Sequence, residues 1–195
     1  MKNLKGLVII FISILLTGCG NNDIDKLSEN LKRIELTGNL VTYHAFYHNV
    51  VEYDKPANTG FLDILRKDRR LFAEYTGTIK LGISLSRVKI DVKGNNINVF
   101  IPKATIIGEP NVDKNDFKKE NFIESSDNLI FTNSITADDS SMAFDKAQNE
   151  MKENALKDEE LLAMAQKRAK ILIEENINQF SGISSNKYTI NWEYE

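Results

Sequence analysis

The stretch TIKLGISL, residues 78–85, indicates the fold class, because apolar residues in it alternate with small or polar ones. The same alternation returns at residues 88–92 and, after a turn at Gly94-Asn95, at residues 97–101. Alternation at every second residue gives a strand one apolar and one polar face, which is typical of antiparallel sheets with one side in water. We therefore predict consecutive antiparallel strands here, the last ending at Pro102.

More strands are expected on both sides of this region. Residues 40–53 are rich in Val, Thr, Tyr and Phe and predict a long strand. A short strand is expected at residues 104–107, and a final one at 187–194, where Tyr, Ile and Trp alternate with polar residues. The polar stretch 109–134, with one candidate strand at 129–131, predicts an irregular connection.

Helical periodicity marks three other segments. Residues 23–36 carry apolar side chains at steps of three and four, which predicts an amphipathic helix. A second helix should begin at about Asp139, capped by Asp138 or Asp139, and a third at Asp158, ending near residue 181. The expected inward residues are Phe144, Ala147 and Met151 on the second helix, and Leu162, Ala165, Ala169, Leu172 and Ile173 on the third.

Because the strands cluster before the C-terminal helices, the sequence predicts an α+β fold. We expect a mainly antiparallel sheet of about five to six strands, packed by two C-terminal helices and rejoined by the final strand. The N-terminal amphipathic helix would follow a short spacer, within residues 19–35. Residues 36–195 would form a single α+β domain.

The start of the chain predicts export and lipid attachment. Lys2 and Lys5 precede an apolar run at residues 7–16, and Leu16-Thr17-Gly18-Cys19 follows. As a helix the run spans roughly 15 Å, against about 30 Å of hydrocarbon in a bilayer. The four residues resemble a bacterial lipobox, which implies a signal peptide at 1–18 and a lipid-modified Cys19; an ordinary signal with a stray cysteine is the alternative. We expect a chain anchored on the extracytoplasmic face of the cell membrane by this lipid.

Charge and cysteine content narrow the classes of partner. The net charge is −3, and loss of Lys2 and Lys5 with the signal would leave 23 basic and 28 acidic residues. An acidic balance argues against nucleic acid, which needs a basic face. Cys19 is the only cysteine, so no disulfide forms within the chain.

Several segments together resemble a known family. They are LVTY at 40–43, EYTGTIKLGI at 74–83 followed by SLS, and NVFIPKA at 98–104, with the late Ala-rich helix. They are similar to the bacterial domain-of-unknown-function family 4230, over roughly residues 36–195. Ser84 stands where the resemblance leads us to expect an acidic residue, so no essential carboxylate is assigned there. The resemblance implies a fold and a domain extent but no activity.

Candidate sites each have a structural explanation as well as a functional one. His44 and His48 have the spacing of a zinc pair on a helix, but on a strand their rings would stand about 13 Å apart, so we predict no metal or other cofactor. Gly77 and Gly82 would mark either a bend in the sheet or an edge to which a peptide adds. The basic residues around Asp68, at positions 66–70, would form either a solvated loop or a contact to lipid headgroups.

No motif for nucleophilic catalysis or phosphate binding is present in the sequence, so we predict no catalytic residues and no enzymatic activity. The expected function is that of a binding module for an envelope protein or peptide. A cell-wall or peptide hydrolase with scattered carboxylates remains the alternative. A binder of small apolar ligands, held between sheet and helices, is a further one.

Overall fold

The computed structural model describes residues 37–55, 69–124, 134–181 and 188–195. They fall into two compact units. The large unit comprises residues 39–55, 69–84, 103–124 and 134–170, and the small unit comprises residues 37–38, 85–102, 171–181 and 188–195. The predicted N-terminal helix, the lipobox and the candidate strand at 129–131 lie outside the described residues.

The large unit is built on two long antiparallel strands, β1 (Asn39–Lys55) and β2 (Arg69–Ser84). Val51 of β1 lies opposite Ala73 of β2, and both are fully buried on the inner face of the sheet. The side of β2 that faces away from β1 pairs with three short strands, which complete a five-stranded sheet. These are β5 (Thr105–Ile106), β6 (Asn111–Val112) and β7 (Phe122–Glu124).

A carboxylate completes the pairing of β2 where these short strands are interrupted. Between β6 and β7 the chain forms two 3₁₀ turns, Lys114–Phe117 and Lys119–Asn121. There Asp116 accepts hydrogen bonds from the backbone N–H of Thr76 (2.8 Å) and from its hydroxyl (3.1 Å). The stretch that we predicted to be irregular therefore contributes two short strands and two turns, held to β2 partly by a side chain.

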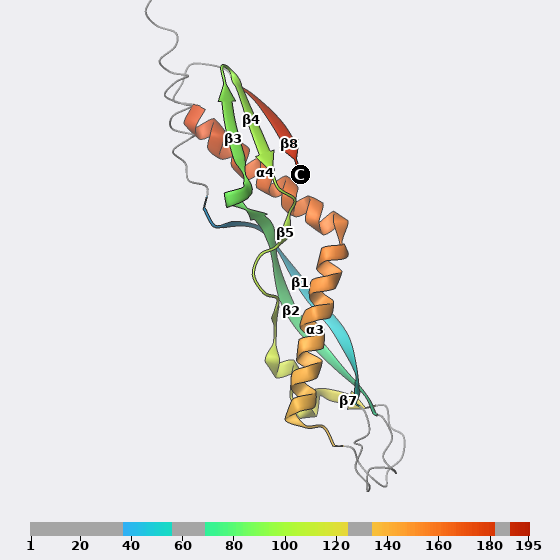
Figure 1. The fold of residues 1–195 in the computed structure, drawn as a ribbon. Helices are drawn as coiled ribbons and strands as arrows, with labels where there is room; N and C mark the ends of the chain where they lie inside the picture. The colour runs from blue at the N-terminus through green and yellow to red at the C-terminus, as the bar shows by residue number, and fades with distance from the viewer. Residues whose placement is uncertain (1–36, 56–68, 125–133, 182–187) are drawn as a thin grey trace, which may run out of the picture. The chain divides into compact units, whose positions relative to one another are not determined.

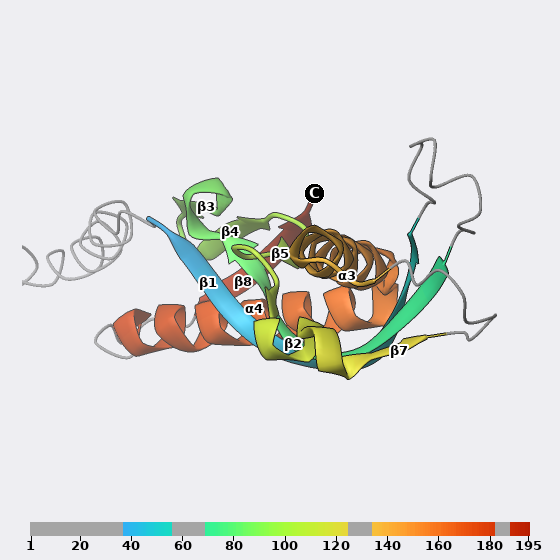
Figure 2. The same cartoon turned by 90° about the horizontal axis from the view of Figure 1, so that it is seen from below.

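Helix α3 (Ala137–Lys157) covers the inner face of this sheet, as Figure 2 shows along the curved β1–β2 ribbon. The predicted inward positions Ala147 and Met151 are confirmed, whereas Phe144 is only half-buried and packs edge-on against Phe117. The predicted cap is wrong. Thr136 is the N-cap, and Asp139 is the third helical residue of a capping box. The buried row repeats every fourth residue: Ala143, Ala147, Met151 and Ala155.

Helix α4 (Glu159–Ser181) begins where the sequence predicts. The carboxylate of Asp158 accepts the backbone N–H of Leu161 at 2.9 Å, which caps the first turn. Ala165, Ala169 and Ile173 are buried as expected, but Leu162 and Leu172 are only half-buried, because Leu161 and Ile177 continue the fourfold row instead. Neither this helix nor any other that the structure describes is long and apolar enough to span a membrane.

The small unit holds a separate three-stranded sheet of β3 (Lys89–Lys93), β4 (Asn96–Ile101) and β8 (Thr189–Tyr194), drawn side by side in Figure 1. β3 and β4 form the predicted hairpin, and β8 runs parallel to β4 with Trp192 opposite Val99. The side-chain amide of Asn191 donates to that of Asn98 at 3.0 Å.

Two expectations about topology are therefore wrong. The final strand does not rejoin the main sheet, and the strands at 88–101 do not continue it. A 3₁₀ turn at Leu85–Arg87 ends β2, and the hairpin that follows pairs with β8 instead. The described residues form eight strands in two sheets where we expected about five to six in one. The α+β class itself is confirmed, with two C-terminal helices and a final strand.

Candidate functional site

The face of the β1–β2 sheet that lies opposite α3 carries exposed side chains on both long strands, and we call it the outer face. Apolar side chains stand exposed on it: Phe46 is 82 % exposed, Val50 59 %, and Ile123 of β7 65 %. Cross-strand register places Phe72 beside Ile123 on the same face. Its strand residues are His44, Phe46, His48, Val50, Glu52 and Asp54 on β1, and Arg70, Phe72, Glu74, Thr76, Thr78 and Lys80 on β2.

An open hollow of about 750 Å³ crosses the outer face from β1 to β6. An exposed aromatic ring, Phe46, lies at its β1 side, and the hydroxyls of Thr76 and Thr78 line its middle. Asn111 and Lys114 line the far side. The hollow thus offers an aromatic surface beside hydroxyl and amide groups, an arrangement that can bind a ligand through both apolar contact and hydrogen bonds.

The two histidines lie on the outer face, both on β1. His48 Nε2 lies 2.5 Å from Glu74 Oε1, and both side chains are about two-thirds exposed. His44 is exposed farther along the same strand. In the described ranges, no three His, Cys, Asp or Glu side chains gather in a group that could hold a metal ion.

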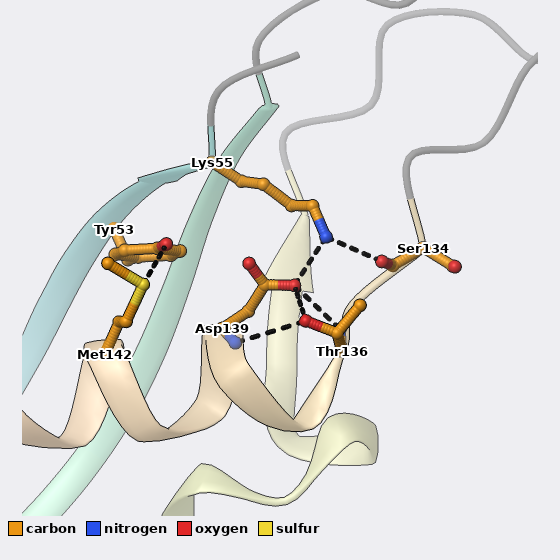
Figure 3. Close-up of polar contacts among 6 residues, drawn as sticks. All are labelled: Tyr53, Lys55, Ser134, Thr136, Asp139 and Met142. Atoms are coloured by element: carbon orange, nitrogen blue, oxygen red, sulfur yellow. Dashed lines mark hydrogen bonds and ion pairs between the residues drawn. The ribbon is translucent and has the colours of Figure 1, made fainter. Parts of the chain in front are cut away.

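A buried ion pair joins the end of β1 to the start of α3 (Figure 3). Lys55 and Asp139 are 6 % and 5 % exposed, and Lys55 Nζ lies 2.5 Å from Asp139 Oδ2. The ammonium also donates to the carbonyl of Ser134 at 2.8 Å. The same Asp139 oxygen accepts the backbone N–H and the hydroxyl of Thr136, each at 2.7 Å. Three donors from Lys55 and Thr136 thus converge on one oxygen of this carboxylate.

The electrostatics of this cluster indicate a structural role. Burial alone would raise the pKa of the Asp139 carboxyl, but hydrogen bonds from Lys55 and Thr136 outweigh it and hold the pKa below its ordinary value of 3.8. Loss of hydration, together with the negative charge of Asp139, raises the pKa of nearby Tyr53, whose hydroxyl donates to the sulfur of Met142 at 3.2 Å. A general acid needs a raised carboxyl pKa, so Asp139 is poorly suited to that task.

Sequence reasoning missed Lys55 and Thr136. The capping box was readable, because Thr136 precedes Asp139 by three residues, the spacing of that motif. Lys55 gave no comparable signal, since a lysine at the end of a strand is ordinarily solvated.

The basic cluster at 66–70 is only partly described. Arg70 begins β2, and its Nε lies 2.7 Å from a carboxylate oxygen of Glu52 and 3.2 Å from one of Asp54. The charge of Arg70 is therefore matched by acidic groups on β1. Positions 66–68 lie outside the described residues.

At both glycines of β2, another part of the chain comes close to the backbone. The hypothesis that a peptide adds to an edge of β2 is wrong. A Cβ on Gly82 would lie 1.9 Å from the carbonyl oxygen of Leu40, and one on Gly77 would lie 2.9 Å from the end of the Met151 side chain. Both sides of β2 are paired, one with β1 and the other with β5, β6 and β7. A peptide therefore has no free edge of β2 to join.

The model of the family described as "Protein of unknown function (DUF4230)" matches residues 32–187. The chain belongs to the DUF4230 family. The matched range of the DUF4230 domain runs from before β1 to beyond α4 and stops just short of β8. No curated protein and no solved structure matches the chain.

Proposed function

We propose that this DUF4230 protein is an exported lipoprotein, anchored through lipid on Cys19, that binds an envelope protein or peptide at the extracytoplasmic face of the membrane. One observation carries the anchor: Leu16-Thr17-Gly18-Cys19 directly follows the apolar run at 7–16. Two acyl chains hold a protein on a bilayer far more durably than one, at about 0.8 kcal/mol per buried CH₂.

The outer face supports the binding part of the proposal. Phe46, Val50 and Ile123 are exposed on one side of the sheet, next to a hollow lined by hydroxyl and amide groups. Exposed apolar side chains rimmed by polar ones are typical of interaction sites. Among the described residues, the carboxylate of Asp139 is buried, and it already forms an ion pair with Lys55 and a hydrogen bond with Thr136. A carboxylate held in this way is poorly suited to acid catalysis, which favours binding over hydrolysis as the role of this domain.

The anchor is tested with a Cys19→Ser variant, expressed beside Ser13→Ala, a control substitution in the same leader but outside the lipobox. We expect the parent and Ser13→Ala to incorporate labelled palmitate and to fractionate with membranes. We expect Cys19→Ser to incorporate none. Equal labelling of Cys19→Ser and parent would contradict the anchor.

The binding surface is tested by affinity purification from detergent-solubilised membranes. The tagged parent is compared with Ile123→Asp, and with Met164→Asp as a control, since Met164 is also exposed but lies on α4. We expect a partner that co-purifies with the parent and the control to be lost with Ile123→Asp. Retention of the same partner by Ile123→Asp would exclude the outer face as its binding site.

A further inference from the structure

The outer edge of β1 is the unpaired boundary of the five-stranded sheet. β1 is 17 residues long and pairs on one side with β2, while its other side pairs with no strand that the structure describes. A long free edge presents alternating N–H and C=O groups and is a template for another strand. Natural edges are usually short, charged or interrupted by a bulge. This edge has a bulge at its start and polar side chains along it, but Phe46 and Val50 between them are exposed and apolar.

The hydrogen bonds around β1 show which residues face the free edge. Lys146 Nζ donates to the carbonyl of Glu52 at 2.6 Å, so we take that carbonyl to point away from β2. Pairing with β2 is regular from Tyr43 to Lys55, and backbone groups of a strand point to alternate sides. The even-numbered residues from 44 to 50 therefore direct their N–H and C=O groups to the same edge.

The free segment has a natural limit at each end. A bulge at Thr42 interrupts the pairing, and the Thr42 hydroxyl donates to the carbonyl of Ala165 in α4 at 2.8 Å. At the other end, Lys146 occupies one lone pair of the Glu52 carbonyl and leaves the second for another donor. Residues 44–52 thus form a usable pairing segment.

We propose that a second copy of this chain pairs with this segment, antiparallel, about a two-fold axis at His48. In that register Phe46 lies opposite the partner's Val50, and His44 lies opposite the partner's Glu52. Symmetry repeats both pairs on the other side of the axis. Apolar cross-strand pairs stabilise neighbouring strands, and an imidazole opposite a carboxylate can donate a hydrogen bond to it.

Neighbouring registers are less complementary. With the axis at Asn49, Phe46 would face the partner's Glu52, and with the axis at Tyr47 it would face the partner's His48. On the inner face, the His48 register places Ala45 opposite the partner's Val51, which adds a third apolar pair. The self-complementarity of the segment therefore specifies a second copy, in one register, as the occupant.

Such a dimer would join two five-stranded sheets into one continuous outer face, with the two hollows on either side of the axis. The inference goes beyond the proposed function, because it depends neither on the lipid at Cys19 nor on an envelope partner. It is tested separately from both.

The axis is tested by disulfide formation in the full chain, purified in detergent. A His48→Cys variant would bring two cysteines into a directly opposed pair, at a Cα separation of about 5.5 Å that lies within the range of disulfides. Lys80→Cys is the matched control, because Lys80 is exposed on β2, away from the edge. The parent, whose single cysteine is Cys19, gives the background. We expect a covalent dimer with His48→Cys alone, and equal dimer from both variants would overturn the proposal.

The apolar pair is tested by sedimentation of the same full chain. We expect the parent and Ile123→Lys to sediment as dimers, because Ile123 lies on β7, on the far side of β2. We expect Val50→Lys, which places a lysine opposite the partner's Phe46, to sediment as a monomer. A monomeric parent, or a Val50→Lys variant that remains dimeric, would overturn the proposal. Substitution of Ile123 is thus expected to abolish binding of the envelope partner but not dimer formation. The two proposals can therefore fail independently of each other.

Discussion

The carbonyl oxygen of Leu40 occupies the place where a side chain on Gly82 would begin, since a Cβ there would lie 1.9 Å from it. This close approach lies beside the bulge of β1, where Leu40 pairs with Ile83, Val41 pairs with Gly82, and the register shifts before Tyr43. The obstruction is backbone, which cannot turn aside as a side chain does. Glycine is therefore required at position 82 for the two paired strands to lie this close together beside the bulge.

We expect Gly82→Ala to be strongly destabilising, by more than about 3 kcal/mol, because a backbone shift must accompany it. Gly77→Ala is the matched comparison. Its Cβ would lie 2.9 Å from the flexible end of Met151 and 3.1 Å from the Asn111 carbonyl, so we expect a smaller loss, of about 1–2 kcal/mol. Urea denaturation of both variants measures the difference. A Gly82→Ala variant as stable as Gly77→Ala would show that the strands do not approach as described.

The buried pair predicts a non-additive pattern of stabilities. We expect Lys55→Met and Asp139→Asn each to lower the free energy of unfolding by about 3–5 kcal/mol, because each leaves a buried group without its partner. The double variant Lys55→Met/Asp139→Leu should lose less than the sum, since it buries no charge. A double-mutant cycle by chemical denaturation tests this. Strictly additive losses would contradict a direct coupling between the two side chains.

The lowered pKa of Asp139 predicts a dependence of stability on pH. Because the carboxyl pKa is lower in the folded chain than its ordinary 3.8, the group stabilises the fold above that pH. The stabilisation is lost as the pH falls below 3.8 through the folded value. We expect the difference in unfolding free energy between parent and Asp139→Asn to be constant near neutral pH and to shrink below about pH 4. A difference that grew on acidification would indicate a raised pKa.

Much of the secondary structure could be predicted because it depends on local patterns. Richness in β-branched and aromatic residues located β1, alternation of apolar residues located the C-terminal part of β2, and a carboxylate at Asp158 located the start of α4. The pairing of strands that lie far apart in the sequence produces no local pattern of this kind. Asn98 and Asn191 lie side by side in a parallel pair although 93 residues separate them, and alternation reports which face of a strand is apolar but not which strand lies next to it.

The candidate site was less predictable than the fold for a related reason. Phe46 alternates with the inward-facing residues of β1, so its place on the outer face follows from strand geometry. Its exposure, in contrast, depends on whether another element covers that face, and none of the described residues does. The pairing of Lys55 with Asp139 joins residues 84 positions apart and follows no local rule. The interruption that Asp116 bridges is likewise a property of the assembled sheet.

That bridge can be tested on its own. We expect Asp116→Ala to lower the free energy of unfolding by about 1 kcal/mol, since the Thr76 N–H and hydroxyl lose their acceptor. Asp145→Ala removes an exposed carboxylate from α3 and serves as the control, with an expected change within about 0.5 kcal/mol. Thermal unfolding of both variants gives the comparison. Equal effects would show that Asp116 does not support β2.

The lipid anchor at Cys19 is tested most directly by measuring the mass of the N-terminal peptide of the chain isolated from membranes. We predict that this peptide begins at Cys19 and carries a diacylglycerol group on its sulfur. A mature chain that begins at another residue, or one whose Cys19 is an unmodified thiol, would contradict it.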